Sequence, residues 1–286
     1  MAEKGVSVII PCYNEERAVG PVLDRVRHTM EALERPYEII AVDDGSADRT
    51  VERLEAAAVT LIRHPHNRGY GAALKTGARA ARHDTLVITD ADGTYPNERI
   101  PELLARLENA DMVVASRTGE RVHVPAARRP AKWALTKLAH YLSGQRIPDL
   151  NSGLRAIRRT LWIKYEPVFP DGFSLTTTLT LAALTNGHVV EYLPINYHAR
   201  VGRSKIRPIR DTMNFIRLIL RTVLYFDPLK VFVPLTLALW AAAVGVGGLS
   251  WLHGRLMDVT TIVLFMTGLQ MLAIGALADL ITKRLR

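Results

Sequence analysis

Apolar residues in the first two-thirds of the chain follow two alternating patterns. Short apolar runs predict buried strands, whereas apolar residues that recur every three or four positions predict amphipathic helices. The predicted strands are 6–10, 37–42, 59–62, 85–89, 112–115 and 154–157, and helices are expected near 15–33, 49–57, 72–82 and 98–108. Single helices between strands form βαβ units, so we expect an α/β fold built on a mostly parallel sheet.

The first predicted helix follows Asn14, whose side chain can cap the helix start, with Glu15 and Glu16 in the first turn. Its apolar face is expected to consist of Val19, Val22, Leu23, Val26, Met30 and Leu33. These positions fall on one side of a helix, so we expect that side to be buried.

A different pattern begins near Leu229. Residues 231–251 and 259–278 contain no charged side chain, and each run is about 20 residues long, enough to cross a hydrocarbon core of roughly 30 Å. Two adjacent core helices of a soluble domain would also give such runs, but the first run is apolar on all sides, which favours a membrane. We therefore expect a transmembrane hairpin of about 231–251 and 259–280 with a short connecting loop.

The charge distribution predicts the orientation of this hairpin. Lys and Arg outnumber Asp and Glu by 37 − 28 = 9, and cations gather from Arg117 onward, which favours a surface for anionic partners. The hairpin loop contains Arg255 alone, whereas its two ends are flanked by Arg207, Arg210, Arg217, Arg221, Lys230, Lys283, Arg284 and Arg286. By the positive-inside rule, we expect a multi-pass protein of the cell (inner) membrane with both termini and the α/β domain in the cytoplasm.

Cysteine usage and the start of the chain agree with that location. The single cysteine, Cys12, excludes an intrachain disulfide and fits a reducing compartment. We expect no cleavable signal peptide, because the chain enters a strand-like run within its first ten residues.

Two basic amphipathic segments, 127–143 and 209–226, precede the hairpin. Each can place apolar residues on one side of a helix and arginine or lysine elsewhere, as helices at a membrane interface do. A cationic, solvated face on an ordinary helix explains either segment equally well, but the neighbouring hairpin favours the interface. The expected organisation is a cytoplasmic domain at 1–207 that includes the first segment, a juxtamembrane amphipathic helix at 208–228 and the hairpin at 229–286.

Polar loops at 11–15, 43–46 and 90–94 follow three predicted strands, and open α/β sheets bind ligands at the carboxyl ends of their strands. Paired carboxylates such as Asp90 and Asp92 suit a divalent cation that also binds a diphosphate, although a solvated Asp-rich turn is the alternative. Asp43 can accept hydrogen bonds from a nucleotide base. The first strand is not followed by G-x-G-x-x-G and no Walker A lysine motif occurs, which argues against a dinucleotide oxidoreductase or a P-loop protein.

Two further loops carry candidate ligands. Residues 198–207 place Arg200, Ser204 and Lys205 around a glycine, which suits a phosphate, although a solvated basic loop has the same composition. Residues 149–153 are polar and turn-prone, and they fit a capped structural turn as well as a functional loop.

The ordered set of these motifs resembles family 2 glycosyltransferases, and its spacing is similar to that of the polyprenyl-phosphate sugar transferases, including dolichol-phosphate mannose synthases. The resemblance covers roughly residues 5–207 and implies a GT-A-type, nucleotide-sugar-binding sheet. It rests on Pro11–Glu15, Val42–Ser46, Asn67–Gly69, Gly71–Gly77, Asp90–Asp92 and Ser116–Arg117. A two-helix membrane tail also agrees with members of that family.

The resemblance implies a role for individual residues. Mg²⁺ or Mn²⁺ and the diphosphate would be held by Asp90 and Asp92, with Thr94 at a position where some relatives carry a metal-contacting glutamine. The donor and acceptor phosphates would lie near Arg117 and Arg129. The nucleoside would be held by Pro11, Tyr13, Glu15 and Asp43, the rest of the nucleotide-sugar site would include Asp44, Lys75 and Ala91, and the diphosphate or lipid phosphate would meet Arg200, Ser204 and Lys205.

These observations predict an inverting, metal-dependent transfer of one sugar from a UDP- or GDP-sugar to a polyprenyl (undecaprenyl or dolichyl) phosphate. A lipid phosphate is already an oxyanion and needs no base, whereas a hydroxyl acceptor would need one. The chain lacks the Gln-x-x-Arg-Trp sequence of processive synthases, which favours a single transfer. Transfer to a lipid hydroxyl and a non-catalytic nucleotide-binding membrane scaffold are the alternatives. We expect no nucleic-acid partner, and Gly245, Gly247 and Gly248 would permit a homo-oligomer through the hairpin.

Overall fold

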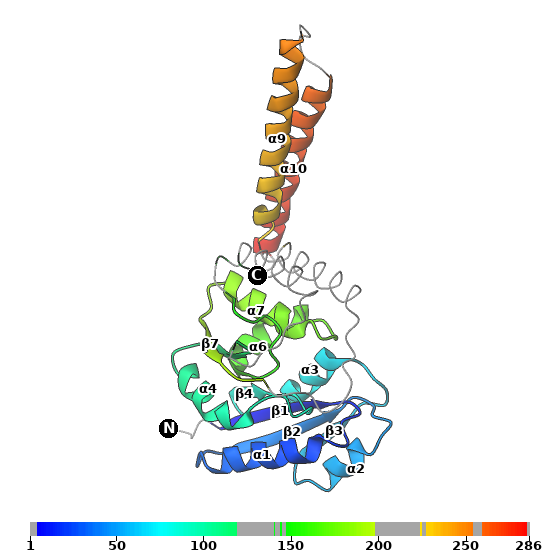
Figure 1. Cartoon of the computed structure of the whole chain (residues 1–286), viewed down its shortest axis with the longest axis vertical. Coiled ribbons are helices and arrows are strands. Elements are labelled where there is room, and N and C mark those ends of the chain that lie inside the picture. The colour runs from blue at the N-terminus through cyan, green and yellow to red at the C-terminus, as the bar shows by residue number, and fades with distance from the viewer. Residues whose placement is uncertain are drawn as a thin grey trace. The chain divides into compact units, whose positions relative to one another are not determined.

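The computed structural model describes residues 5–118, 140, 144, 147–197, 224, 227–253 and 259–284. It divides into two compact units, Met1–Ile216 and Arg217–Arg286. Figure 1 shows the whole chain.

The first unit is built on a seven-stranded sheet with the order β3-β2-β1-β4-β6-β5-β7. All neighbouring strands are parallel except β6, which runs antiparallel to both β4 and β5. The mostly parallel α/β fold is therefore confirmed. The strands are β1 (Val6–Cys12), β2 (Tyr37–Asp43), β3 (Thr60–Arg63), β4 (Thr85–Ile88), β5 (Met112–Ser116), β6 (Arg155–Arg158) and β7 (Val190–Pro194).

Helices lie on both faces of this sheet (Figure 1). Successive side chains of a strand point to opposite faces. Val8 and Ile10 of β1 accordingly share one apolar cluster with α1 and α4, whereas Ile9 faces Gly77 of α3. The helices are α1 (Val19–Glu31), α2 (Thr50–Glu55), α3 (Tyr70–Ala80), η1 (Asn97–Arg99), α4 (Ile100–Leu107), α6 (Arg159–Tyr165), η3 (Glu166–Val168) and α7 (Leu175–Thr185).

The structure corrects the predicted junction between the first strand and the first helix. Strand β1 continues through Pro11 to Cys12, where it still pairs with β2. Helix α1 begins at Val19 without a side-chain cap, so the prediction that Asn14 caps it is wrong. Asn14 instead has φ +53°, its N–H donates to Ser46 Oγ at 2.9 Å, and its Oδ1 accepts from the backbone N–H of Ala47 at 2.8 Å. The predicted apolar face of α1 is buried except for Leu33, which is partly buried against it.

Helices α6 and α7 and strand β7 were not predicted. Helix α7 buries ten of its eleven residues and mixes threonines with its leucines and alanines on every side, so it lacks the periodicity by which a surface helix is recognised. Strand β7 adds a parallel edge to β5, with Val190 opposite Met112.

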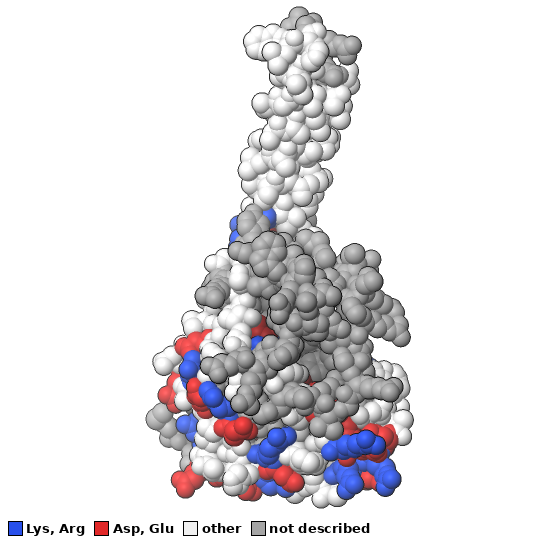
Figure 2. All heavy atoms as spheres, viewed as in Figure 1, with Lys and Arg blue, Asp and Glu red and all other residues white. Residues whose placement is uncertain are grey.

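The second unit contains two long apolar helices, α9 (Leu229–Leu252) and α10 (Val259–Arg284), which pack against one another in antiparallel fashion. Gly268 lies against Trp240, and Gly275 lies against Phe232. Within the described residues, both helices are long and apolar enough to span a membrane, and only 11% of each apolar window is buried. Their surface is almost free of charged side chains (Figure 2).

The ends of this hairpin also bear on earlier predictions. Asp279 pairs with Lys283 at 2.8 Å near the end of α10. A Cβ at Gly247 would lie 3.2 Å from Thr261 of the same chain, while a Cβ at Gly245 or Gly248 would meet no atom of another described segment within 4 Å. Pairing of two copies through these glycines stays a prediction.

Several predicted features lie outside the described residues. They are the amphipathic segments 127–143 and 209–226, apart from residues 140 and 224, the basic loop 198–207, and the site residues Arg129, Arg200, Ser204 and Lys205.

Candidate active site

Three predicted site loops lie at one edge of the sheet, because β1, β2 and β4 are parallel neighbours. Residues 11–15 follow β1, residues 43–46 follow β2, and residues 90–94 follow β4 shortly after its end. Hydrogen bonds tie the first two loops together: the N–H of Asn14 donates to Ser46 Oγ at 2.9 Å, and the N–H of Asp44 donates to the carbonyl of Cys12 at 2.8 Å. Pro11, Tyr13, Glu15 and Asp43, predicted to hold a nucleoside, therefore belong to one connected edge.

Asp90 is held from two sides. Tyr70 at the start of α3 donates its hydroxyl hydrogen to Asp90 Oδ1 at 2.9 Å. Burial and the neighbouring Asp90 charge raise the pKa of Tyr70, so its hydroxyl keeps the proton that it donates. On the other side, Gly153 leaves no room for a Cβ, which would lie 2.6 Å from Asp90 Oδ2, and its N–H donates to Tyr95 Oη at 2.7 Å. The position of this carboxylate is therefore set by the surrounding fold.

Asp92 and Thr94 form a tight turn after Asp90. The hydroxyl of Thr94 donates to Asp92 Oδ1 at 2.6 Å and its backbone N–H donates to the same oxygen at 3.1 Å. Ala91, Asp92 and Thr94 are all buried. Metal binding by Thr94 stays a prediction, because this hydrogen bond does not test it.

The donor set of this turn fits a divalent cation bound together with a diphosphate. Within the part of the chain that the structure describes, no group of three or more His, Cys, Asp or Glu side chains is placed to hold a metal. Two carboxylates suit Mg²⁺ or Mn²⁺ when phosphate oxygens and water supply the remaining ligands. Asp90 and Asp92 would hold such an ion, and the ion would supply positive charge to a leaving diphosphate.

Asp43 and Asp44 are adjacent in sequence and have different environments. Asp44 accepts from His64 at 2.7 Å and from the backbone N–H groups of Arg68 and Gly69 at 2.9 and 2.8 Å. His64 in turn lies 2.9 Å from Thr76 Oγ1 in α3. Asp44 therefore fixes the loop before α3. This is a structural role, whereas the sequence had placed Asp44 only in the nucleotide-sugar site.

The start of α3 is joined to residues 169–173. Lys75 Nζ lies 2.5 Å from Asp171 Oδ1 and donates to the carbonyl of Phe169 at 3.2 Å. The backbone N–H of Ala72 donates to the carbonyl of Asp171 at 3.0 Å. Lys75, predicted at the nucleotide-sugar site, thus has its charge paired with Asp171.

Arg117 is also paired. Its Nε and Nη2 donate to the two carboxylate oxygens of Asp149 at 2.7 and 2.9 Å, and its guanidinium lies 5.3 Å from the centre of the Tyr197 ring. Burial raises the pKa of Asp149, but the hydrogen bonds and charge of Arg117 outweigh it and lower that pKa overall. Burial lowers the pKa of Arg117, and its hydrogen bond with Asp149 reverses that and raises it.

Arg155 was missed by sequence reasoning. It is completely buried in β6, where its Nη2 donates to the carbonyl of Ser152 at 2.6 Å and its Nη1 donates to the carbonyl of Thr176 at 3.1 Å. Burial lowers its pKa. An arginine inside a strand of apolar residues was the available signal, because a buried cation needs fixed partners. Through Ser152, Arg155 supports the loop that touches Asp90.

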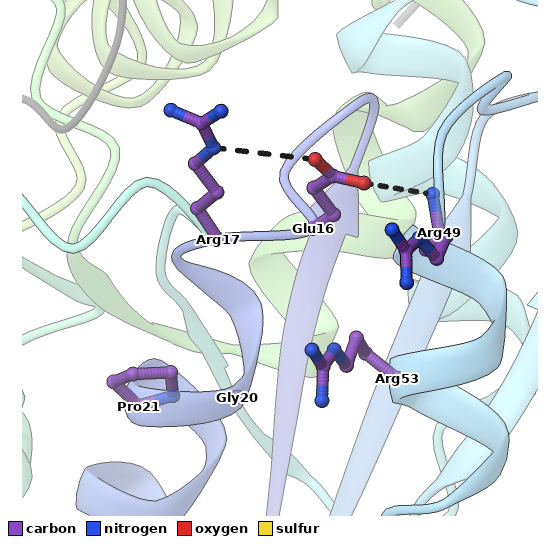
Figure 3. Close-up of a pocket in the computed structure, with 6 residues that line it drawn as sticks. All are labelled: Glu16, Arg17, Gly20, Pro21, Arg49 and Arg53. Carbon is purple, nitrogen blue, oxygen red and sulfur yellow. Dashed lines mark hydrogen bonds and ion pairs between the residues drawn. The ribbon is translucent and has the colours of Figure 1, made fainter.

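A separate pocket of about 460 Å³ opens on the surface between the start of α1 and α2. Figure 3 shows its lining residues, with Glu16 between Arg17 and Arg49. Glu16 Oε2 accepts from the backbone N–H of Arg49 at 3.2 Å, and Glu16 Oε1 lies 4.0 Å from Arg17 Nε. The lining contains neither Asp90 nor Asp92, so we do not assign the chemistry to this pocket.

Paired acids at the carboxyl edge of an open, mostly parallel sheet place the chain among the α/β proteins that bind their ligands at that edge. The chain belongs to glycosyl transferase family 2, whose model matches residues 7–165. A second model, the GtrB C-terminal hairpin, matches residues 227–284. The chain is therefore a glycosyltransferase, and its two-helix tail matches the C-terminal hairpin that the second model describes.

Relatives with assigned names support the same family. A dolichyl-phosphate hexose transferase of Haloferax volcanii is 30% identical over 208 residues, which cover 71% of this chain and 87% of the relative. A low-salt glycan biosynthesis hexosyltransferase of the same organism is 27% identical and covers 98% of this chain and 70% of the relative. An undecaprenyl-phosphate 4-deoxy-4-formamido-L-arabinose transferase of Pseudomonas fluorescens is 38% identical, but the match spans about half of each protein, 54% and 47%.

Solved structures share the fold. Glucosyl-3-phosphoglycerate synthase from Mycobacterium tuberculosis, crystallised with Mn²⁺, UDP-glucose and phosphoglyceric acid, gives a TM-score of 0.60 at 22% identity. The match covers 77% of this chain and 80% of that protein. The complex of the same synthase with UDP gives a TM-score of 0.61 at 21% identity. At these identities the likeness establishes the fold alone.

Proposed function

We propose that the protein transfers one sugar from a nucleoside diphosphate sugar to a polyprenyl phosphate, with inversion at the anomeric carbon and with Mg²⁺ or Mn²⁺. The observation that carries the proposal is the combination, in one chain, of Asp90 and Asp92 at the carboxyl edge of the sheet with an apolar two-helix tail. Relatives named as dolichyl- and undecaprenyl-phosphate sugar transferases support the choice of acceptor.

The site chemistry favours a phosphate acceptor over a hydroxyl acceptor. A hydroxyl must lose its proton to a base during attack, whereas a lipid phosphate already carries the attacking oxyanion. Among the described residues, Asp149 is bound to Arg117 and His64 is held between Asp44 and Thr76. Groups committed to such partners are poorly placed to accept an acceptor proton.

The donor would bind by its nucleoside at the 11–15 and 43–46 loops and by its diphosphate at the metal beside Asp90 and Asp92. The charge that develops on the leaving diphosphate is stabilised by fixed positive charge. Arg129, Arg200, Ser204 and Lys205, all in basic segments of the sequence, would add to that charge. Attack by the lipid phosphate from the opposite side of the sugar inverts the anomeric configuration.

Location at the cytoplasmic face of the membrane is part of the proposal. The tail supplies two helices of membrane-spanning length, and its two ends are flanked by more cations than its loop, which has Arg255 alone. An isoprenoid acceptor stays in the bilayer, so an enzyme that uses its phosphate must work at the membrane surface.

The test is a transfer assay on membranes from cells that express the chain. Labelled UDP- and GDP-sugars are supplied in turn with Mn²⁺ or Mg²⁺ and with undecaprenyl or dolichyl phosphate. The expected product is a lipid-linked monosaccharide, and chelation of the metal should prevent its formation. Asp92→Asn should lower the rate at least about 100-fold, because it removes a charge that holds the metal.

A matched control is Asp24→Asn, which changes an exposed acid of α1 and should leave the rate unchanged. Transfer to diacylglycerol or ceramide, with none to polyprenyl phosphate, would replace the proposal by glycolipid synthesis. Nucleotide-sugar binding without transfer to any acceptor would indicate a non-catalytic scaffold.

A further inference from the structure

Phe173 is a large aromatic side chain that the fold leaves 76% exposed beside the candidate active site. Its ring stacks on that of Tyr70, with 5.3 Å between the ring centres and 19° between their planes. Tyr70 is the residue whose hydroxyl donates to Asp90. The exposed face of Phe173 is therefore separated from a predicted metal-binding carboxylate by a single side chain.

The loop that carries Phe173 is fixed by several contacts. Lys75 pairs with Asp171, and the backbone N–H of Ala72 binds the carbonyl of Asp171. Side chains at Gly69 and Gly71 would collide with the backbone of residues 170–172. Helix α7 starts two residues after Phe173 and is buried along its length. An isolated exposed apolar residue is ordinary on a protein surface, but one held in place next to a reactive centre is preorganised for a ligand.

We propose that the exposed ring of Phe173 binds the isoprene unit next to the phosphate of the acceptor lipid. The inference rests on the proposed function, since it requires a polyprenyl phosphate as acceptor. The acceptor phosphate must approach the sugar beside the metal, so its first isoprene unit must lie within a few ångströms of that point. Tyr70 contacts Asp90 through its hydroxyl and stacks on Phe173, so the two rings form an aromatic surface that leads away from that point.

The chemistry of Phe173 favours the lipid over the donor sugar. The hydroxyl groups of a sugar need hydrogen-bond partners, and the phenyl ring offers none. A branched isoprene unit carries no hydrogen-bonding group, and its transfer from water to an aromatic face is favourable in proportion to the area covered. The ring would thus determine acceptor specificity without touching the reacting atoms.

The experiment measures steady-state constants for both substrates in Phe173→Ala, Phe173→Leu and the wild-type protein. A water-soluble isoprenyl phosphate of two isoprene units serves as acceptor, so that partition into detergent does not affect the result. In Phe173→Ala, the KM for this acceptor should rise about tenfold, while the KM for the donor and kcat stay within about twofold. Phe173→Leu should recover most of the affinity, because it restores apolar area without an aromatic ring.

Ile163→Ala is the matched control, because Ile163 is an apolar residue of α6 that is 58% exposed and lies outside the loop joined to α3. It should change neither KM. An unchanged acceptor KM in Phe173→Ala overturns the inference, and a raised donor KM alone assigns the ring to the sugar instead. If the wild-type protein makes no product from any polyprenyl phosphate, the proposed function fails as well. Active wild-type protein with an unaffected Phe173→Ala variant refutes this inference alone.

Discussion

The Gly153→Ala variant should displace the carboxylate of Asp90 while leaving the protein folded. A Cβ at residue 153 would lie 2.6 Å from Asp90 Oδ2, 2.7 Å from Oδ1 and 2.8 Å from Cγ. Ordinary van der Waals contact begins at 3.4 Å, so Oδ2 must move by 3.4 − 2.6 = 0.8 Å. Gly153 does not have a positive φ, so alanine fits its backbone conformation. The carboxylate, as the end of a side chain, moves more easily than the backbone.

The expected result is a folded protein with poor activity. A displacement of nearly 1 Å at a catalytic centre costs about 100-fold in rate, which corresponds to about 2.7 kcal/mol in the activation barrier. The melting temperature should fall little, because no apolar contact is lost. The binding of Mn²⁺ in the presence of a nucleoside diphosphate should weaken, since Asp90 no longer points to the same place.

The assay combines the initial rate of transfer to polyprenyl phosphate, Mn²⁺ binding followed by electron paramagnetic resonance, and thermal unfolding. Gly20→Ala is the control, because a Cβ at that helical glycine has nothing within 4 Å. If Gly153→Ala keeps Mn²⁺ binding and transfer within twofold of the wild-type values, Asp90 does not hold the metal in the way argued above. A variant that unfolds would instead show that the backbone, and not the carboxylate, absorbs the collision.

Three further predictions concern packing, pH dependence and topology. Gly77→Ala should lower the free energy of unfolding by about 1–3 kcal/mol in denaturant titration, because its Cβ would lie 2.5 Å from Ile9 Cγ2; an unchanged midpoint would contradict the packing of α3. The pKa of Asp149 is lowered on folding, so its contribution to stability is present above about pH 4 and is lost as the pH falls below that value. Asp149→Asn should therefore flatten the acid limb of a plot of stability against pH, and an unchanged limb would argue against the pair with Arg117. Arg255→Cys should react with an impermeant maleimide added to intact cells, while the buried Cys12 does not; labelling only after lysis would reverse the proposed orientation.

Most of the sheet could be predicted because buried strands and one-sided helices have different apolar periods. The same reasoning placed Asp90 and Asp92 correctly at the edge of the sheet, since parallel strands bring their carboxyl ends together. Helix α7 escaped prediction because it is buried on all sides and shows no period. The capping role given to Asn14 was wrong because its partners, Ser46 and Ala47, belong to a different βα loop.

Part of the site could not be predicted, because it depends on contacts between residues that are far apart in the sequence. Arg117 and Asp149 are 32 residues apart, and Lys75 and Asp171 are 96 residues apart. A single sequence contains no sign of either pair. Arg117 was predicted to lie near phosphates and Lys75 to belong to the nucleotide-sugar site, and in each case the structure adds an acid that the prediction did not consider. The 149–153 loop shows the same effect, because it is a structural turn at Asp149 and also contacts Asp90 through Gly153.

These pairs change the charge expected at the edge of the sheet. Lys75 is matched to Asp171 and Arg117 to Asp149, so the charge of neither cation is fully available to a diphosphate near Asp90 and Asp92. A nucleoside diphosphate brings further negative charge to the same place, and like charges in a partly buried site repel strongly. We infer that a divalent ion is required for donor binding itself and not for the transfer step alone. Calorimetric titration with a nucleoside diphosphate should therefore detect no binding in EDTA and clear binding with Mn²⁺, and equal affinity in both conditions would contradict the inference.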